Sequence, residues 1–579
     1  MQRKNYLELL KQSPSAMDES LKKVKIAILA NHSIQQFARI LKTTLRDERF
    51  EAQVYEAPYD SIAFETFDET SELYAFQPDY VYLSFAMQKY RERFLSCALP
   101  QEKEQLPSLM FDELKQIVEK LRSRDLKVIL AVPPLPFERI FGNFGAVTNQ
   151  SLYGSCLTFN YKILEFSRQN KLLINDLMFI SNSVGNNNFL DERLWASSKY
   201  LCANKFLPDI SYSLARVIAV DNGVITKCLV IDLDNTMWGG IIGDDGINGI
   251  SLGGDAYGDS FLTFQKYILS LKKRGYILAV CSKNTHEIAM DAIVNHPEMI
   301  LREADFAVIM ANWTDKASNI SHIASVLNIG LDSIVFIDDS PFERDLVKTA
   351  LPMVHVPEMP EDSSLYVKAL EDSGLFESTN FSEEDSSRND MYRVEALRST
   401  EKLQSNNIEE YLSSLEMKIE FKSFSEVDLP RIAQLIQRSN QFNLRTQRLS
   451  EIECSKYSKV EGKIGLSARF SDKFGDYGII SAVCLDRVED FLMISELVMS
   501  CRVLKRGVED CLINQIFGVC NLLGLEGVRG EYIPTSKNSL VKDFYKNFGF
   551  RRCESNEEIE IWHLSSAEFT NRPHLIEGI

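Results

Sequence analysis

Two aspartates follow an apolar run in the segment CLVIDLDNT, which spans residues 228–236. Side chains alternate along a strand, so Asp232 and Asp234 begin on the same face. Two carboxylates at the end of a buried strand repel each other, and the repulsion falls when a cation lies between them. Hard oxygen ligands beside a phosphate suit Mg²⁺. The pair therefore predicts a magnesium site beside a carboxylate that can act as a nucleophile.

Three further segments carry groups of matching chemistry. One apolar run stops at Ser282, another stops at the acidic pair Asp338 and Asp339, and between them Lys316 falls in the first turn of an expected helix. Together with Asp232 they supply a nucleophile, a hydroxyl, an ammonium and further acids. Phosphoryl transfer needs such a set, because it proceeds by in-line attack with a proton donor and with positive charge around the transferred group.

Short β-rich runs must position these groups. They alternate with segments of helical periodicity from residue 24 to about residue 357. Apolar runs separated by helices are typical of parallel strands buried on both faces, so we expect an α/β fold with a central Rossmann-like parallel sheet. Ligands bind at the carboxyl edge of such sheets, where the acids lie. The expected strands are Val24–Leu29, Tyr80–Ser84, Lys127–Val132, Lys171–Asn175, Lys227–Leu233, Tyr276–Cys281, Asp305–Met310, Ser333–Ile337 and Met353–Val356.

The 579 residues are too many for one hydrophobic core, because cores stop growing at about 250–300 residues. Turn-rich and polar stretches at Asp221–Thr226 and Glu371–Asn389 mark boundaries. We expect an α/β domain over residues 1–222, a second over 223–370, a linker with a connecting helix over 371–404, and an α+β domain over 405–579. The elements expected in the last domain are strands at Gly478–Leu485 and Phe491–Val498 and helices at Gly507–Leu523 and Lys537–Phe548.

The composition excludes several classes of protein. Hydrophobic residues are 45% and charged residues 25%, which is ordinary for a globular chain and excludes bulk disorder. The formal charge of −18 argues against a nucleic-acid partner. The sequence contains no run of about 20 apolar residues, so it predicts no membrane span. The 11 cysteines form no C-x-x-C pair, which is typical of reduced thiols, so we expect a cytoplasmic protein.

The four chemical segments, in this order, resemble the motifs of the haloacid dehalogenase (HAD) superfamily of phosphotransferases. The resemblance implies that Asp232 is the nucleophile, forming an aspartyl-phosphate, and that Asp234 is the general acid and then the general base. Thr236 and Ser282 would hold phosphoryl oxygens, and Lys316 would neutralise charge. The implied ligands of Mg²⁺ are Asp232, the main-chain carbonyl of Asp234 and Asp338, with Asp339 close by.

The spacing of these segments adds a further expectation. A Gly-rich hairpin, GGIIGDDGINGISLGG, and one helix fill the first interval, and a strand and a helix fill the second. Neither interval leaves room for a folded cap domain, so we expect a capless, open site. An open site suits a phosphate presented on something bulky, such as the arm of a carrier protein.

The longer segment DLDNTMWGGIIGDDG, with SKN at 282–284 and DDSPFER at 338–344, looks like the FkbH-like family, HAD subfamily IIIC. The segments NQFN at 440–443, FGDYG at 474–478, SCR at 500–502 and PTSKN at 534–538 look like parts of its longer members. Such proteins act in polyketide and related pathways. They are associated with dephosphorylating 1,3-bisphosphoglycerate and loading its glyceryl group on an acyl carrier protein. The resemblance implies that Asn284 binds substrate, that Mg²⁺ is the cofactor, and that a small phosphorylated acid and a carrier's phosphopantetheine arm are the partners.

Residues 405–579 also resemble the GNAT acyltransferase fold, with its C-terminal signature at FYKNFGF, 544–550. The pyrophosphate loop of that fold aligns with Arg502–Gly507, where Lys505 replaces an expected Gly. A side chain there blocks close approach of the backbone, or its charge helps to hold a phosphate. Arg502, Lys505 and Gly507 are therefore candidates for binding CoA or a pantetheine phosphate. The alternative is a fold kept for structure or docking.

Residues 24–220 look like the degenerate SGNH-hydrolase-like region of long FkbH-like proteins. The nucleophile position falls near Ser33, but a Gly-Asp-Ser turn and a late Asp-x-x-His are missing. Without a placed base Ser33 is a weak nucleophile, so we expect a binding or scaffold role. Cys281 and Cys501 lie near the two other sites. Strand alternation turns Cys281 away from Ser282, which favours a core position for its thiol.

Three functions remain open from the sequence. The first is an Mg²⁺-dependent HAD-type enzyme that dephosphorylates a small phosphorylated acid and loads the acyl group on a carrier protein. The second is a phosphatase of free metabolites with structural flanking domains. The third is a docking scaffold for carrier proteins without catalysis.

Overall fold

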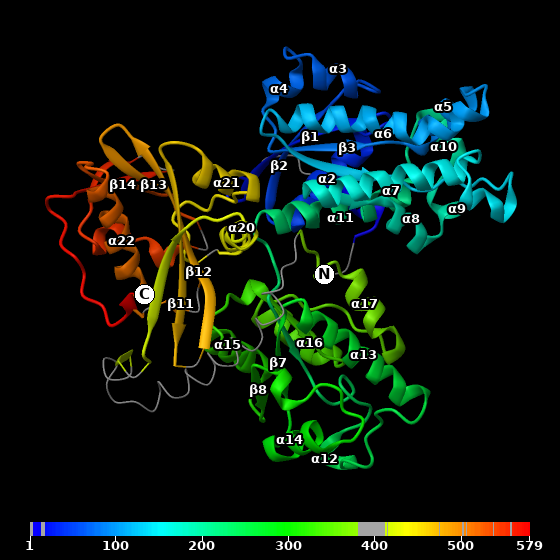
Figure 1. Ribbon diagram of the computed structural model, residues 1–579. Coiled ribbons are helices and arrows are strands. Elements are labelled where there is room, and N and C mark those ends of the chain that lie inside the picture. Colours follow the sequence, from blue (N-terminus) through cyan, green and yellow to red (C-terminus); the bar gives the residue numbers. More distant parts are fainter. Residues whose placement is uncertain are drawn as a thin grey trace. The chain divides into compact units, whose positions relative to one another are not determined.

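The computed structural model of the chain (Figure 1) describes residues 4–12, 18–379, 412–413, 415–439, 441–473, 475–500, 503–504, 506–535, 538–555 and 559–578. The chain divides into two compact units, Gln2–Val220 and Asp221–Ile579. Of the expected linker and connecting helix, residues 380–404 lie outside the described part. Among the helices that the structure describes, none has the length and apolar character needed to cross a bilayer.

The first unit contains a five-stranded parallel sheet in the order β2-β1-β3-β4-β5. Residues of β1, β3 and β4 form one core with α5, α6 and α7. On α2, Phe37 packs on Tyr82 of β3, with ring centroids 5.7 Å apart. The strands are β1 Lys22–Ala30, β2 Phe50–Glu56, β3 Tyr80–Ser84, β4 Lys127–Val132 and β5 Leu173–Asp176. The helices are α1 Tyr6–Lys11, α2 Gln35–Asp47, α3 Ile62–Phe67, α4 Glu72–Phe76, α5 Met87–Ser96, α6 Pro100–Arg122, α7 Leu152–Asn170, α8 Leu177–Val184, α9 Asn186–Phe189, α10 Glu192–Ser198 and α11 Leu207–Asp221.

The second unit begins with a four-stranded parallel sheet in the order β8-β7-β6-β9. The inner strand β6, Cys228–Ile231, is apolar on both faces. Leu229 and Ile231 belong to one core with α13 and α14, whereas Cys228 and Val230 belong to another with α15 and α16. The strands are β6 Cys228–Ile231, β7 Ile277–Ser282, β8 Val308–Ala311 and β9 Ile334–Ile337. The helices are α12 Ile242–Asp245, α13 Ala256–Lys273, α14 His286–Asn295, α15 Lys316–Val326, α16 Pro341–Ala350 and α17 Tyr366–Asp372.

Helix α13 shows how the sequence builds this layer. Its N-cap Asp255 accepts a hydrogen bond from Gly258 N at 2.7 Å, which satisfies one of the free amides of the first turn. The residues Phe261, Phe264, Ile268 and Leu271, which share one face at helical spacing, are all buried. The α/β fold with a central parallel sheet is thereby confirmed for this part of the chain.

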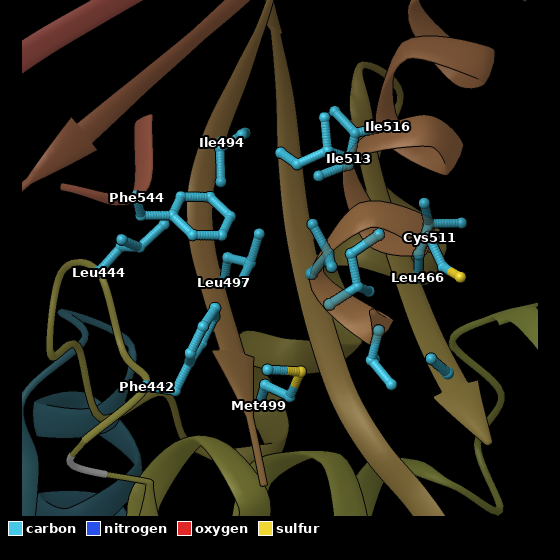
Figure 2. Close-up of a cluster of buried hydrophobic side chains, with 14 of the residues drawn as sticks. Phe442, Leu444, Leu466, Ile494, Leu497, Met499, Cys511, Ile513, Ile516 and Phe544 are labelled. Carbon is cyan, nitrogen blue, oxygen red and sulfur yellow. The ribbon is translucent and has the colours of Figure 1, made fainter. Parts of the chain in front are cut away.

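The described residues from 412 to 578 form an α+β domain with an eight-stranded mixed sheet, β15-β16-β14-β13-β12-β11-β10-β17. Figure 2 shows part of its main core, to which Ile494 and Leu497 of β13 and Ile513 and Ile516 of α22 contribute. The strands are β10 Lys418–Ser423, β11 Lys463–Asp472, β12 Gly475–Val488, β13 Phe491–Met499, β14 Gly527–Tyr532, β15 Arg551–Ser555, β16 Glu560–Ser565 and β17 Glu577–Gly578. The helices are α20 Leu429–Arg438, α21 Glu451–Lys459, α22 Val508–Leu522 and α23 Phe544–Asn547.

Two local expectations were wrong, and one strand was missed. Strand β2 was not anticipated, because FEAQVYE mixes polar and apolar residues in a strand at the edge of its sheet. The strand expected at Met353–Val356 is a single bridge between Val335 and His355. The one helix expected at Lys537–Phe548 is instead a 3₁₀ turn, Ser539–Val541, followed by the short α23.

Candidate active site

The carboxyl edge of the four-stranded sheet brings predicted site residues together. Asp232 follows β6, Ser282 ends β7, Asp338 follows β9, and Lys316 opens α15, the helix after β8. Asp232 N donates to Ile337 O at 2.9 Å, which extends the pairing of β6 with β9 by one residue. The parallel register therefore sets the two acids beside each other at the end of the sheet.

Lys316 is the buried cation of this edge, with 4% of its surface exposed. Its Nζ lies 2.9 Å from Asp232 Oδ1 and also pairs with Asp338 Oδ2. The N-cap Asp315 accepts a hydrogen bond from Ser318 N at 2.8 Å and fixes where α15 begins. Burial alone would lower the pKa of Lys316, but the two carboxylates raise it well above its usual value. The ammonium therefore stays protonated and charged.

Three carboxylates, those of Asp232, Asp338 and Asp339, offer oxygen atoms that all lie within 4.8 Å of one another. Burial, and then the charge of Asp232, raise the pKa of Asp338 and of Asp339, although Lys316 opposes the shift. One ammonium cannot balance three such acids. The donor set therefore fits a divalent cation that prefers hard oxygen ligands.

Asp234 is held in one orientation by three donors. Its Oδ1 accepts from Trp238 Nε1 at 2.9 Å and from Ile242 N at 3.0 Å, and its Oδ2 accepts from Asn284 Nδ2 at 2.8 Å. Burial raises the pKa of Asp234, and the charge of Asp232 adds to the shift while the hydrogen bonds oppose it. A carboxyl with a raised pKa in a fixed position is suited to giving and taking a proton.

Two hydroxyl groups complete the edge. Thr236 is fully buried, and its Oγ1 accepts from Asp339 N at 3.2 Å and lies 3.4 Å from Asp339 Oδ1. Ser282 is 2% exposed, and its Oγ lies 3.5 Å from Asn284 Nδ2. Thr236 thereby connects the loop after β6 with the end of β9, whereas the contact of Ser282 stays within the segment at the end of β7.

Arg344 is a site residue that the sequence reasoning did not single out. Its Nη1 donates to the main-chain carbonyls of Asp338 at 2.8 Å and Asp339 at 2.6 Å, and the side chain is buried. The guanidinium thus fixes the loop that carries the acidic pair. The sequence signal that could have found Arg344 is its place at the end of the DDSPFER segment. It falls in the first turn of α16, from which a long side chain reaches back to the loop of the acidic pair.

The candidates in the C-terminal domain are placed only in part. Arg502 and Lys505 lie outside the described residues, as does Cys501. Gly507 has φ +86° and precedes α22 as its N-cap, a left-handed conformation that favours glycine. A Cβ at this position would lie 3.7 Å from His574 Cβ, which is ordinary van der Waals contact.

The NQFN and PTSKN segments meet in the same domain. Asn538 Nδ2 donates to Asn443 O at 3.0 Å and to Ile533 O at 2.9 Å. Leu444 N donates to Leu497 O at 3.4 Å, and Ile533 N donates to Leu444 O at 2.9 Å. Leu444, which directly follows the NQFN segment, therefore bridges β13 and the chain after β14. The bridge lies beyond the point where those two strands pair, and Asn538 fixes the backbone of Asn443 beside it.

Ser33, at the expected nucleophile position, and Cys281, the candidate thiol, both make contacts within the fold. Ser33 Oγ donates to Ser198 O at 2.5 Å, whereas the neighbouring His32 places its Nε2 2.7 Å from Ser84 Oγ. Burial lowers the pKa of His32 to about 4. Cys281 is buried in the core on the α15 side, and burial raises its pKa to about 12, so its thiol stays protonated.

A parallel sheet that brings an Asp-x-Asp loop, a hydroxyl, a buried lysine and an acidic pair to one edge defines a HAD-type phosphatase domain. Comparison with known proteins agrees with this class. A solved structure of the N-terminal part of the protein BF1531 from Bacteroides fragilis, containing a phosphatase domain and complexed with Mg, is 34% identical. The match covers 65% of this chain and 100% of that chain, with a TM-score of 0.62.

Residues 25–219 match the family model described as FkbH, N-terminal domain. With 34% identity over the whole of the BF1531 structure, the chain belongs to the same family as that phosphatase-domain protein, and its N-terminal domain matches the FkbH model.

Two acetyltransferase structures are more distant. The ribosomal-protein-S18-alanine N-acetyltransferase from Escherichia coli is 14% identical over 25% of this chain and 93% of its own, with a TM-score of 0.21. The spermidine N-acetyltransferase from Vibrio cholerae is 14% identical over 26% and 97%, also with a TM-score of 0.21. The search of curated proteins gave no significant match.

Proposed function

We propose that this chain is an Mg²⁺-dependent phosphohydrolase and acyltransferase. In this proposal the substrate is a small phosphorylated acid, such as 1,3-bisphosphoglycerate. The carrier's thiol displaces the acyl phosphate and forms the thioester, and the HAD-type site hydrolyses the phosphate ester. The observation that carries the phosphatase part is the buried cluster in which Lys316 pairs with both Asp232 and Asp338 beside the Asp339 carboxylate.

Asp232, Asp338 and the main-chain carbonyl of Asp234 are the groups that would hold Mg²⁺, with Asp339 close by. The crowding of three acids around one ammonium supports this assignment, as does the Mg in the BF1531 structure. When bound, the ion supplies positive charge to the phosphoryl oxygens and relieves the repulsion among the carboxylates.

The chain's own residues perform two half-reactions. A carboxylate oxygen of Asp232 attacks phosphorus, and the bond from phosphorus to the leaving oxygen breaks as Asp234 gives that oxygen a proton. Asp234, now ionised, then takes a proton from a water molecule whose oxygen attacks the aspartyl-phosphate, which releases phosphate and restores Asp232. Thr236 and Ser282 donate hydrogen bonds to phosphoryl oxygens, while the Lys316 ammonium stabilises their charge.

Carrier loading is supported by family membership and by the short connections around the site. Between β6 and β7 the described elements are the short α12 and α13, which leaves the edge without a cap domain. We assign Asn284 to substrate binding. Arg502, Lys505 and Gly507 are assigned to the phosphate of the carrier's arm.

The test is incubation with a phosphorylated glycerate, Mg²⁺ and a pantetheinylated carrier, followed by intact-mass measurement of the carrier and by phosphate detection. A mass gain on the carrier together with phosphate release is the expected result. Phosphate release without a carrier adduct would leave a phosphatase of free metabolites. A folded protein that gives neither product would leave a docking scaffold and overturn the proposal.

A further inference from the structure

Helix α17 follows the last of the four chemical segments and reaches back to the first of them. The hydroxyl of Tyr366, its first residue, donates a hydrogen bond to the main-chain oxygen of Asn235 at 2.9 Å. Asn235 lies directly after Asp234 and directly before Thr236. A side chain 131 positions further along the chain therefore holds the middle of the loop that carries the proposed proton donor.

Packing fixes the ring of Tyr366 in place. Helix α17 lies beside α13 (Figure 1), and the ring packs edge-on against Phe261 and Phe264 of that helix, with ring centroids 6.3 and 5.5 Å apart. Tyr366 is 3% exposed. Burial, and then the charge of Asp339, raise the pKa of Tyr366, so its hydroxyl stays protonated and acts as the donor.

Asn235 has a backbone conformation that needs such support. Its φ is +54°, in the left-handed region, which is uncommon for residues other than glycine although asparagine enters it more readily than most. Two hydrogen bonds within the loop hold it: Asn235 N donates to Gly240 O at 3.3 Å, and Asn235 Oδ1 accepts from Gly240 N at 2.9 Å. The bond from Tyr366 adds a restraint from outside the loop.

The conformation of Asn235 determines how its two neighbours are presented. In a trans peptide the C=O and the N–H point in opposite directions. The Asn235 N–H that is directed at Gly240 therefore also sets the direction of the Asp234 carbonyl, the proposed main-chain ligand of Mg²⁺. On the other side, the Asn235 carbonyl that Tyr366 holds sets the plane of the peptide that leads into Thr236. Rotation of either peptide would displace a group that the proposed reaction uses.

We propose that Tyr366 is a positioning residue of the phosphatase site: its hydroxyl holds Asn235 in the left-handed conformation on which the presentation of its two neighbours depends. This inference rests on the proposed function and adds to it a residue that lies outside the four chemical segments. Because Tyr366 acts through Asn235 and not on the substrate, its removal should slow the chemical step and weaken Mg²⁺ binding, with little effect on substrate binding.

The substitution Tyr366→Phe tests this role, because it removes the hydroxyl and keeps the ring. With the full chain, Mg²⁺ and p-nitrophenyl phosphate, we expect kcat to fall by about tenfold while KM stays within about twofold. Mg²⁺ binding, measured by calorimetry without substrate, should weaken by about tenfold. The matched control is Tyr267→Phe, which removes a hydroxyl from a partly buried tyrosine of α13 in the same core and should leave all three quantities unchanged.

A second variant separates positioning from packing. Tyr366→Leu removes both the ring and the hydroxyl, so it should lower the melting temperature as well as kcat and Mg²⁺ affinity. If Tyr366 serves only the core, Tyr366→Phe should match the native chain in kcat and in Mg²⁺ affinity, and only Tyr366→Leu should lose them. That pattern would overturn the proposal.

The outcomes distinguish this inference from the proposed function. If the native chain neither hydrolyses p-nitrophenyl phosphate nor binds Mg²⁺, both fail. If the native chain does both and Tyr366→Phe does so equally well, the phosphatase assignment stands and the positioning role is overturned. A rise in KM with kcat unchanged would assign Tyr366 to substrate binding and would also overturn that role.

Discussion

At the scale of single residues, the site depends on one buried ammonium that lies between two buried carboxylates. Lys316 is too deeply buried to be a surface ion pair, and its partners Asp232 and Asp338 are also buried. Removing the ammonium of such a set leaves uncompensated buried carboxylates, which costs more than the intact set contributes. Substitutions here therefore affect chemistry and stability separately, and the two effects have to be measured side by side.

The substitution Asp232→Asn removes the proposed nucleophile but keeps its size. We expect phosphate release from a phosphomonoester with Mg²⁺ to fall by about three decades or more, because the amide cannot form the aspartyl-phosphate. Circular dichroism should show an unchanged fold. The mechanism is wrong if this variant keeps full activity, and Asp259→Asn serves as a control for the loss of one acidic charge.

The substitution Lys316→Met tests the ammonium. Without it, Asp232 and Asp338 repel each other in a buried site, so we expect the free energy of unfolding in EDTA to fall by about 3–5 kcal/mol. Urea unfolding measures this value. Lys316→Arg, which keeps the charge, should lose less stability. An unchanged unfolding curve for Lys316→Met would show that the ion pairs contribute nothing.

At the scale of elements, the site is an edge that four parallel strands share, and a metal bound there couples their ends. Saturating Mg²⁺ should stabilise the native protein, by about 2.7 kcal/mol at a hundredfold excess over the dissociation constant. Asp338→Asn should abolish this gain because it removes one ligand. In EDTA the same variant should be no less stable than the native protein, since it also removes a carboxylate from a crowded site.

Thermal unfolding with and without Mg²⁺ measures both the stabilisation by Mg²⁺ and the effect of Asp338→Asn in EDTA. An equal Mg²⁺ shift in the native protein and in Asp338→Asn would contradict the assignment of Asp338 as a ligand. Phosphate release by the native protein should stop in EDTA and return when Mg²⁺ is added back.

The strands that carry the site could be predicted because they are apolar on both faces and each stops at a polar group. The ends of β6, β7 and β9 were therefore placed within about one or two residues. Strand β2 was missed because its sequence, FEAQVYE, mixes polar and apolar residues and so lacks this signal. A single helix was expected at Lys537–Phe548 because no Gly or Pro interrupts that stretch. In the structure the side-chain amide of Asn538 donates to two backbone carbonyls instead.

The hydrogen bonds that orient the site residues could not be predicted from the sequence. Nothing in local pattern shows that Ile242 N reaches Asp234, or that Arg344 spans the carbonyls of Asp338 and Asp339. These contacts join segments that become neighbours only when the parallel sheet has formed. The residue types at the edge were predictable, whereas their mutual distances needed the fold.

At the scale of the whole molecule, the separate cores predict separable activities. The BF1531 structure is that of an N-terminal part, and it matches 65% of this chain over its full length. A protein that ends at residue 379 should therefore fold and keep phosphate release from acetyl phosphate within about threefold of the full chain. It should lose transfer to the carrier.

Intact-mass measurement of the carrier and a phosphate assay test this truncation. Carrier loading at the full-length rate would show that residues 380–579 are dispensable for transfer. Loss of phosphate release in a well-folded truncated protein would show instead that the C-terminal domain supports the chemistry itself.

The two-sided covering of β6 has a consequence for how the protein acquires activity. A strand with no polar face is fully covered only when its neighbours on both sides and the helices above and below it have docked, so the site at its end is complete only when the whole sheet has formed. Partly folded chains should be catalytically silent. Recovery of turnover during refolding is consequently a stricter gauge of correct assembly than recovery of helical signal.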